Sequence, residues 1–427
     1  MAEHVVIAGA GIAGLTMALT CLQIGAPVRV FESAREIRPL GVGINLQPNA
    51  VRELIELGLG PQLPGIGLEA EEWALVGRNG NDIWSEPRGR RAGYRWPQYA
   101  VHRGELQMLL LEAVRERGGD ETIVEGHRLV GYDNGADAIT AHFEDRSTGA
   151  TVSVDGALLI AADGLHSAAR RQHYPEEGEP IWGGAVLWRG MSLGEPIRSG
   201  ASFTLVGNLD QRFVHYPIGP VDPATGLQRQ NWIAELTFDP EAGWDAAGWN
   251  QVVDPSVFLP AFAEWDFDWL DIPALVSRAD QVWEYPMVDR DPVPTWIDGR
   301  MGLIGDAAHV MYPVGSNGAS QAIVDARVVG ASMVEHGATP DALRAFEARL
   351  HDDVSALVLR NRGAGPVAIL GEVDERCGGV FDVIDDVIPR AEIDAFMDRY
   401  KTAAGFAMDT LHRSPPTIAS GARLRSQ

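Results

Sequence analysis

The sequence contains very little cysteine, which excludes two kinds of architecture. Cys21 and Cys377 are the only cysteines in 427 residues, and neither belongs to a C-x-x-C motif. A disulfide framework or a structural zinc site needs more thiols at closer spacing. We therefore predict neither disulfide nor metal, and a reducing, cytoplasmic location.

Basic residues are also scarce. The chain has 35 Lys and Arg against 59 Asp and Glu, a formal net charge of −24, and Lys401 is its single lysine. Nucleic acids and anionic membranes bind basic faces of proteins, so we expect neither as a partner. Any anionic cofactor must be held by local arginines and by backbone N–H groups.

Long apolar runs are absent except for one near the start of the chain. Residues 5–28 carry no charge over a length that could cross a bilayer. Three spaced glycines together with Thr16, Thr20 and Gln23 suit lipid poorly, and no basic segment precedes the run as in a secretion signal. We therefore predict a globular protein, and its length indicates two or three domains.

What the sequence does contain is a glycine-rich turn at 9–14, which reads Gly-Ala-Gly-Ile-Ala-Gly. It lies between a predicted strand at 5–8 and a predicted helix at 15–23. In dinucleotide-binding turns one glycine permits the tight turn, one lets the backbone approach a pyrophosphate, and one lets helix and strand pack closely. A second predicted strand at 28–31 leads to Glu32, whose carboxylate suits an unphosphorylated adenosine ribose. This pattern predicts a dinucleotide fold but does not separate NAD from FAD.

The middle of the chain changes from mixed to strand-like patterns. Apolar spacing predicts a helix over 104–117 and strands at 122–124 and 152–161. Between 185 and 238 the pattern predicts an antiparallel sheet in a domain of its own. Its four predicted strands cover 185–188, 202–206, 212–216 and 231–236.

The remaining segments are predicted from composition. Residues 87–97, rich in Arg, Gly and aromatic side chains, indicate a surface excursion between elements. The chain beyond Ser320 is predicted to be mainly helical. Residues 414–427 form a polar tail with little reason to fold.

Two further motifs join the glycine turn. An apolar strand at 158–161 leads into Asp163-Gly164 and then Ser167 and Arg170, and positions 305–309 read Gly-Asp-Ala-Ala-His. With all three motifs in this order and approximate spacing, the chain resembles the single-component FAD-dependent aromatic monooxygenases. It departs from the commoner family pattern by carrying alanine at 161. Within that family the stretches 41–50, 286–292 and 316–321 look like those of the phenazine-modifying hydroxylases.

The resemblance implies an α/β fold. It consists of a discontinuous Rossmann-like FAD-binding domain, an inserted β-sheet substrate domain and a C-terminal helical segment. The expected boundaries are 1–75, 101–180 and 285–360 for the FAD-binding domain, 76–100 and 181–284 for the substrate-binding domain, and 361–427 for the C-terminal helices and tail.

The resemblance also implies the cofactor residues. Asp306 follows the apolar strand 301–304 and would accept hydrogen bonds from the ribityl chain, although an aspartate there also suits a helix cap. The loop from Pro313 opens a helix, expected to end near Gly330, whose N–H groups would face the flavin. Arg103 would contact FAD or remain a solvated surface arginine. The expected cofactor-binding residues are Gly9, Gly11, Ala13, Gly14, Glu32, Val42, Gly43, Arg103, Asp163, Asp306, Pro313, Gly315, Asn317, Gly318 and Ala319.

The family connects the Asp-Gly element with both FAD and nicotinamide nucleotides, although Asp163 equally suits a turn-forming role. By resemblance, NAD(P)H reduces the flavin, oxygen adds at C4a, and the hydroperoxide hydroxylates an aromatic or N-heteroaromatic ring, with decarboxylation where the ring bears a carboxylate. Only one dinucleotide turn is present, so NAD(P)H is expected to visit transiently. The expected partners are a small aromatic substrate and O2, with the chain a monomer or homodimer.

Substrate residues are sought on the predicted strands and the late loop. Side-chain alternation puts Leu187 and Arg189 on one face of their strand and Trp188 on the other. His215 or Tyr216 would serve as a phenol-activating base, and each equally suits ordinary sheet packing. His309 is interpreted as structural. The expected substrate residues are Gln47, Trp188, Arg189, Tyr216, Pro313 and Val314.

Two rival functions share the FAD fold. A flavin-dependent halogenase passes oxidised halide through a lysine, but Lys401 lies far beyond the motifs, and residues 265–269 do not match the Trp-x-Trp-x-Ile-Pro pattern. A flavoprotein that only sequesters an aromatic ligand is the other rival. Ligand-stimulated NAD(P)H consumption separates that rival from a hydroxylase.

Overall fold

A computed structural model of the chain describes residues 4–242, 251–403 and 408–425. Its centre is a six-stranded sheet in the order β21-β22-β12-β1-β2-β8, parallel except for the edge strand β21. The strands are β21 (Ile297–Asp298), β22 (Met301–Leu303), β12 (Leu158–Ala161), β1 (Val5–Ala8), β2 (Val28–Phe31) and β8 (Ile123–Val124). The predicted parallel dinucleotide fold is confirmed.

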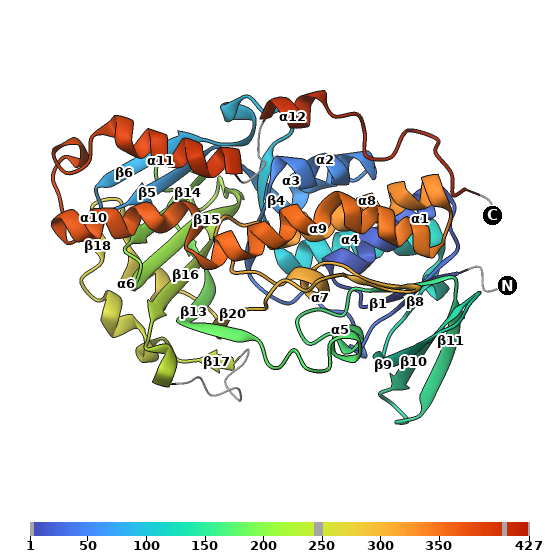
Figure 1. Cartoon of the computed structure of the whole chain (residues 1–427). Helices are drawn as coiled ribbons and strands as arrows, with labels where there is room; N and C mark the ends of the chain where they lie inside the picture. The colour runs from blue at the N-terminus through green and yellow to red at the C-terminus, as the bar shows by residue number, and fades with distance from the viewer. Residues whose placement is uncertain (1–3, 243–250, 404–407, 426–427) are drawn as a thin grey trace.

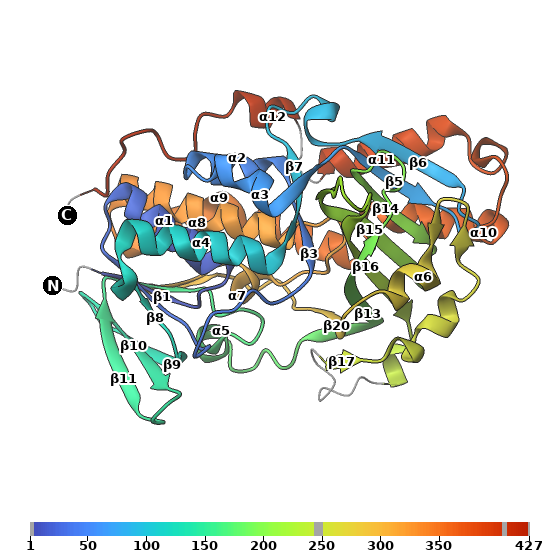
Figure 2. The same ribbon diagram turned by 180° about the vertical axis from the view of Figure 1, so that it is seen from behind.

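Helices cover one face of this sheet and a small sheet covers the other (Figure 1). The helices are α1 (Ile12–Ile24), α4 (Arg103–Gly118), α8 (Gly318–His336) and α9 (Pro340–Arg362). The small sheet consists of β9 (His127–Asn134), β10 (Ile139–Asp145) and β11 (Thr151–Gly156). Turning the molecule by 180° brings α4 to the front, beside α1 (Figure 2).

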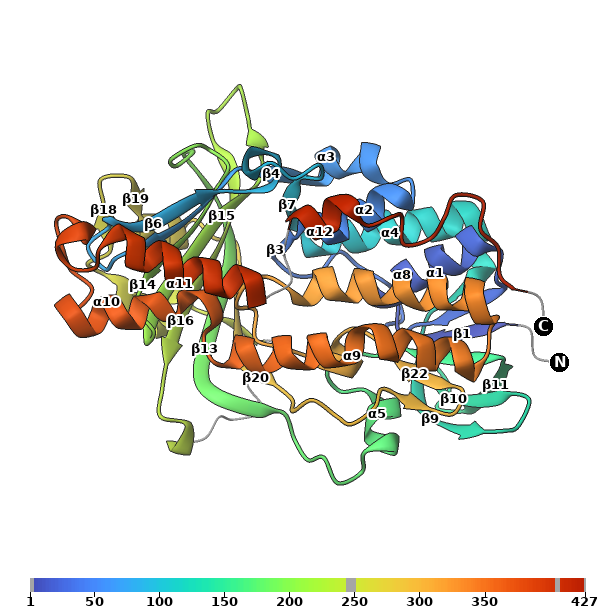
Figure 3. The same cartoon turned by 45° about the horizontal axis from the view of Figure 1, so that its top comes forward.

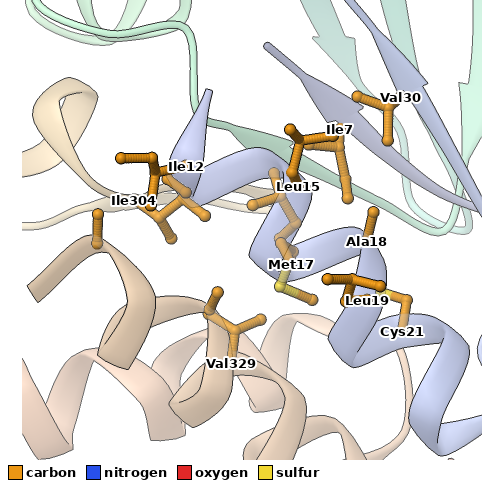
Figure 4. Close-up of a cluster of buried hydrophobic side chains, with 14 of the residues drawn as sticks. Ile7, Ile12, Leu15, Met17, Ala18, Leu19, Cys21, Val30, Ile304 and Val329 are labelled. Carbon is orange, nitrogen blue, oxygen red and sulfur yellow. The ribbon is translucent and has the colours of Figure 1, made fainter. Parts of the chain in front are cut away.

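The core of this domain surrounds α1 (Figure 4). Ile7 on β1, Leu15 and Met17 on α1, and Val329 on α8 are all fully buried. The helix is apolar on nearly all sides because it lies between the sheet and two other helices, which explains its long uncharged sequence. Within the described ranges, no helix combines the length and apolar character that crossing a membrane requires.

The second large sheet has eight strands in the order β17-β20-β13-β16-β15-β14-β5-β6, antiparallel except for the pair β14 and β5. Its strands are β17 (Gln251–Val253), β20 (Val282–Asp289), β13 (Ile181–Gly194), β16 (Gln228–Thr237), β15 (Gln211–Val221), β14 (Ser202–Gly207), β5 (Glu72–Val76) and β6 (Asp82–Pro87). The four strands predicted between 185 and 238 are thus confirmed. By sheet membership this unit starts at Glu72, inside the segment 1–75 that was assigned to the cofactor domain.

Other elements of the chain pack against both faces of the eight-stranded sheet. On one side, Phe258 and Phe262 pack with Trp188, Phe213 and Trp232. The other side is partly covered by the C-terminal helices α10 (Ile369–Cys377) and α11 (Arg390–Ala403), as the tilted view shows (Figure 3). A short sheet of β3 (Gly43–Leu46), β7 (Gln98–His102) and β4 (Gly67–Ala70) lies where the two large sheets meet.

Two predicted elements differ from the structure. The strand predicted over 152–161 is two strands in different sheets, β11 and β12, which Ala157 separates. Apolar alternation cannot show where a chain leaves one sheet for another. The helix α8 continues past Gly330 to His336. Gly330 does not end the helix; its missing side chain lets Thr20 of α1 and Ile418 pack closely against α8.

The polar tail predicted to remain unfolded is instead packed against the cofactor domain. Ile418 is 4% exposed and belongs to the main core, and the Leu424 amide donates to Ile24 O at 2.8 Å. The Thr417 hydroxyl donates to Glu53 at 2.7 Å. The buried Ile418, the partly buried Ala422 and Leu424, and a few hydrogen bonds therefore order a segment whose composition indicates disorder.

We expect Ile418→Ala to destabilise the protein by about 2–4 kcal/mol, since the substitution leaves a cavity between α1 and α8. Thermal or urea unfolding of the purified protein measures this loss. The matched control is Val383→Ala, which removes a side chain that is 54% exposed and should change stability by less than about 0.5 kcal/mol. Equal stability of the two variants would show that the tail contributes nothing.

Candidate active site

A cavity of about 970 Å³ lies between the turns that follow strands of the six-stranded sheet and one face of the eight-stranded sheet. From the cofactor domain it includes Gly11, Ala13, Ala162, Gly164, Arg103 and Asp306. From the loop before α8 it includes Pro313, Val314, Gly315, Asn317, Gly318 and Ala319. From the eight-stranded sheet it includes Leu187, Arg189, Arg212, Val214, Tyr216, Ile233 and Glu235. The structure therefore brings the first and last motifs, some three hundred residues apart, to one cavity.

The three glycines of the first turn have three different geometries. Gly9 has φ +100°, and a Cβ there would lie 2.4 Å from Ala162 O. A Cβ on Gly14 would lie 1.9 Å from Gly9 O, whereas nothing lies within 4 Å of the position that a Cβ on Gly11 would take. Gly9 thus permits the turn, Gly14 permits close packing, and Gly11 leaves room for a ligand in the cavity.

Two helix N-termini face this cavity without capping side chains. Neither α1, which begins after Gly11, nor α8, which begins after Asn317, has a side-chain cap or an acidic residue in its first turn. Free N–H groups at a helix N-terminus bind anionic groups. Both amide-group atoms of the buried Asn317 also lack hydrogen-bond partners within the described chain. These features fit a dinucleotide with a pyrophosphate at α1 and a flavin at α8.

Asp306 is the first residue of the short helix α7 (Asp306–His309) and is exposed to the cavity. Its place at the carboxyl end of β22 follows the general rule for ligands of parallel sheets. Within the described residues its carboxylate makes no hydrogen bond and keeps its acceptor capacity for a ligand. The position suits the expected hydrogen bonds with a ribityl chain.

We expect Asp306→Ala to weaken FAD binding about 10- to 100-fold, the loss expected for hydrogen bonds to a charged group. Fluorescence titration of the apoprotein with FAD measures this change. Asp353→Ala, which removes an exposed carboxylate on α9, is the control and should bind FAD as the wild type does. Unchanged FAD affinity of the Asp306 variant would remove the residue from the cofactor site.

Arg170 and His309 are buried side chains whose hydrogen bonds hold the backbone of the Gly-Asp motif at 305–309. Arg170 is 2% exposed, and its Nη1 donates to Ala307 O at 3.1 Å and to Ala308 O at 2.6 Å. His309 Nε2 lies 2.6 Å from Asp325 Oδ2, which also accepts from the Gly305 amide at 2.9 Å. The Asp325 carboxylate raises the pKa of His309 against the opposing effect of burial. The structure thus supports the structural interpretation of His309.

Five predicted cofactor residues lie beside the cavity without lining it: Gly9, Gly14, Glu32, Val42 and Asp163. Glu32 accepts from the amides of Ala10 and Ala34, each at 2.7 Å, and so holds the glycine turn. Asp163 accepts from the Ala168 amide at 2.7 Å at the start of a helix, the turn-forming role left open above. Burial raises the pKa of its carboxyl group, opposed mainly by the hydrogen bond to Ser167.

The cofactor domain is joined to the eight-stranded sheet at Gly43. Its amide donates to Asn231 Oδ1 at 2.7 Å, and its carbonyl accepts from Arg189 Nη2 at 3.0 Å. Four residues further on, Gln47 connects the same segment to the loop before α8, since its amide donates to the Ser320 hydroxyl at 2.9 Å and its side chain to Gly315 O at 3.1 Å. These contacts hold the predicted flavin loop against the predicted substrate face.

The cavity face of the sheet follows strand alternation. Arg212, Val214 and Tyr216 of β15 line the cavity, while Phe213 packs in the aromatic core of the opposite face. His215 lies on that opposite face, fully buried, and burial lowers its pKa to about 4. The sequence prediction of His215 as a base is therefore corrected, because its side chain does not reach the cavity.

The prediction of Trp188 as a substrate residue is also corrected, because its side chain does not reach the cavity. Its ring stacks on Phe258 at 4.9 Å and its indole N–H donates to Glu284 at 2.7 Å, behind the sheet. Its neighbours Leu187 and Arg189 line the cavity, as alternation predicts. The other predicted substrate residues, Gln47, Arg189, Tyr216, Pro313 and Val314, all line the cavity.

Several lining residues are missing from the sequence prediction. Arg212 and Val214 share strand parity with Tyr216, so extending that alternation would have found them. The segment 87–97, predicted as a surface excursion, lines the cavity through Arg88 and Tyr94. Val367, Met397 and Met408 of the C-terminal segment also contribute, and no local pattern marks them. Within the described ranges, no cluster of His, Cys, Asp or Glu could hold a metal ion.

Comparison with known proteins agrees with this geometry. Residues 2–360 match the family model described as an FAD binding domain. The phenazine 1,6-dicarboxylic acid hydroxylase PhzS of Lysobacter antibioticus is 45% identical over 367 residues, covering 84% of this chain and 89% of that protein. The 3-hydroxybenzoate 6-hydroxylase 1 of Aquipseudomonas alcaligenes is 30% identical, covering 76% of this chain and 79% of that protein.

Solved structures support the same fold. HpxO of Klebsiella pneumoniae, in complex with FAD and uric acid, superposes with a TM-score of 0.73 at 24% identity, covering 97% of each chain. A salicylate hydroxylase substrate complex superposes with a TM-score of 0.72 at 20% identity, covering 98% of each chain. The family model spans both uncapped helix N-termini, and the relative that is 45% identical covers 84% of the chain, so the chain belongs to the FAD-binding-domain family of aromatic hydroxylases.

Proposed function

We propose that this protein is an FAD-dependent, NAD(P)H-consuming monooxygenase that hydroxylates a planar N-heteroaromatic acid of the phenazine class. The observation that carries the proposal is one cavity that joins two uncapped helix N-termini to the apolar floor of the eight-stranded sheet. The similarity to the phenazine 1,6-dicarboxylic acid hydroxylase supports the substrate class.

The residues that would hold FAD are divided between two regions. Gly11 and the start of α1 would bind the pyrophosphate, and Asp306 the ribityl chain. The backbone from Gly315 to Ala319 would face the flavin ring, where the α8 dipole favours negative charge. Bound FAD supplies the chemistry, taking electrons from NAD(P)H and activating O2.

The sheet would bind and orient the substrate. Leu187, Val214 and Ile233 form an apolar floor that suits a flat ring and excludes water. Arg189 and Tyr216 lie at the side nearest Gly43, so the reacting part of the ring would lie beside them. Tyr216 is 3% exposed and stacks on Phe203 with ring centroids 5.2 Å apart, which fixes its phenol in place.

A turnover assay tests the proposal. Purified protein with FAD should oxidise NADH or NADPH at least about tenfold faster when phenazine-1,6-dicarboxylic acid is added. Mass analysis should find one added oxygen, with loss of carbon dioxide where hydroxylation falls on a carboxylate-bearing carbon. Unstimulated NAD(P)H consumption with tight ligand binding would favour the sequestering flavoprotein instead.

Tyr216 should act as a neutral phenol. Burial raises its pKa to about 12, although nearby Arg189 lowers it, so the group is protonated from pH 6 to 10 and cannot serve as a base there. We expect Tyr216→Phe to alter KM or kcat without removing an ionisation from the pH profile of kcat/KM between pH 6 and 10. A basic limb below pH 10 that disappears in this variant would contradict the assignment.

A further inference from the structure

A buried ion pair lies inside the cavity, apart from the polar groups near Gly43. The Arg212 guanidinium on β15 pairs with the Glu235 carboxylate on the neighbouring strand β16. Their side chains are 7% and 8% exposed, and both line the cavity. Removing two charges from water is costly, and a buried ion pair is on its own weak evidence for stability. This pair therefore needs an explanation beyond folding.

Strand register gives the layout of the cavity face. Arg212 and Glu235 are paired across β15 and β16, the next inward-facing pair is Val214 and Ile233, and the one after is Tyr216 and Asn231. Along β15, Arg212 and Tyr216 are four residues apart, roughly 13 Å. An apolar strip thus separates a polar end near Gly43 from a charged end at Arg212.

The charged end has unused hydrogen-bonding capacity. Arg212 donates to Glu235 through Nη2, while its buried Nε has no acceptor within the described chain. A buried donor without a partner is unfavourable, whereas a ligand oxygen would satisfy it. An arginine also presents its donors as a planar fork that matches a carboxylate.

We infer that Arg212, held in place by Glu235, recognises a carboxylate on the end of the substrate ring remote from Gly43. This inference rests on the proposed function and narrows its substrate class to flat aromatic acids with a polar group at each end of an apolar middle. Glu235 is a positioning residue, since it orients Arg212 and offsets its charge. The pair acts on specificity and leaves the oxygen chemistry to the other end of the cavity.

A binding experiment tests the pair without turnover. The probes are phenazine-1-carboxylic acid and phenazine-1-carboxamide, titrated into the FAD-loaded protein in the absence of NAD(P)H and followed by the flavin absorbance. The wild type should bind the acid about 10- to 100-fold more tightly than the amide, the range expected for a hydrogen bond to a charged group. Comparable affinity for acid and amide would overturn the inference.

Two variants test whether Arg212 and Glu235 cause the preference for the acid over the amide. Arg212→Lys keeps a cation beside Glu235 but removes the Nε donor, and should reduce the acid-to-amide ratio about tenfold with FAD retained. The double variant Arg212→Met with Glu235→Met removes both charges together and should abolish the preference for the acid over the amide. An unaltered ratio in the lysine variant would overturn the assignment even if the double variant did not fold.

The matched control is a second arginine pair, formed by Arg198 in the turn between β13 and β14 and Glu72 on β5. Arg198 and Glu72 pair at 2.8 Å outside this cavity, so Arg198→Met with Glu72→Met should leave the acid-to-amide ratio as in the wild type. The experiments also distinguish a failure of this inference from a failure of the proposed function. Binding that depends on Arg212 without any hydroxylated product contradicts only the function, whereas hydroxylation with equal KM for acid and amide contradicts only the inference.

Discussion

Gly14→Ala is expected to abolish FAD retention and to destabilise the fold by about 3 kcal/mol, at the upper end of the overpacking range. A Cβ at this position would lie 1.9 Å from the carbonyl oxygen of Gly9 and 3.3 Å from Ile7. The neighbour is backbone of the same turn, so α1 must move away from β1 to accommodate a methyl group. Thermal unfolding and the flavin absorbance retained after gel filtration measure the two effects.

Gly11→Ala is the matched control, since it adds the same methyl group three residues earlier in the same turn. Gly11 has φ −74°, and no atom lies within 4 Å of the position of its Cβ. The variant should unfold within about 0.5 kcal/mol of the wild type. Its FAD affinity should fall about tenfold or more, because the methyl group would occupy space needed by the pyrophosphate. A Gly14 variant as stable as the Gly11 variant would contradict this division of roles.

Arg170→Met is expected to destabilise the protein by about 3–5 kcal/mol, the cost of breaking a buried charge network. Arg170 donates to Glu177 through Nε at 2.9 Å, and its Nη2 donates to Asp291 O at 3.0 Å. With the bonds to Ala307 and Ala308, it ties the Asp-Gly motif to the Gly-Asp motif. Methionine would fill most of the volume but leave these acceptors without their shared donor. Urea unfolding measures the loss.

The neighbouring Arg171 provides the control. It is exposed, and its guanidinium donates only to His166 O, at 3.3 Å, among the described residues. Arg171→Met should change stability by less than about 0.5 kcal/mol and leave FAD affinity intact. The Arg170 variant should also bind FAD more weakly, because Asp306 precedes the two carbonyls that Arg170 holds. Equal stability and equal FAD affinity of the two variants would show that the hydrogen bonds of the Arg170 side chain are dispensable.

The cofactor half of the site was largely predictable from the sequence. The glycine turn, its strand and its helix are contiguous, so a local pattern determines their geometry. The strand β1 begins and ends where the sequence predicted, and α1 begins three residues earlier than the predicted start at 15. Asp306 also follows its strand directly, and the cavity contains it as expected.

The substrate half was predicted less well, for a physical reason. Side chains alternate along a strand, so only one of two neighbours can face the cavity, and the sequence does not say which face is which. His215 and Tyr216 were both proposed, and only Tyr216 lines the cavity. The pair of Arg212 and Glu235 comes from different strands, 23 residues apart, and became visible only through their register.

By itself, the sequence determined the family, the cofactor and the chemistry, because the motifs for these are short stretches in which neighbouring residues act together. Tertiary structure alone decided which side chains share the cavity, how Arg170 joins two motifs, and why Ile418 orders the tail. Those features depend on contacts between distant segments. The free energy of such contacts comes from burial and charge pairing, which no local pattern of residues records.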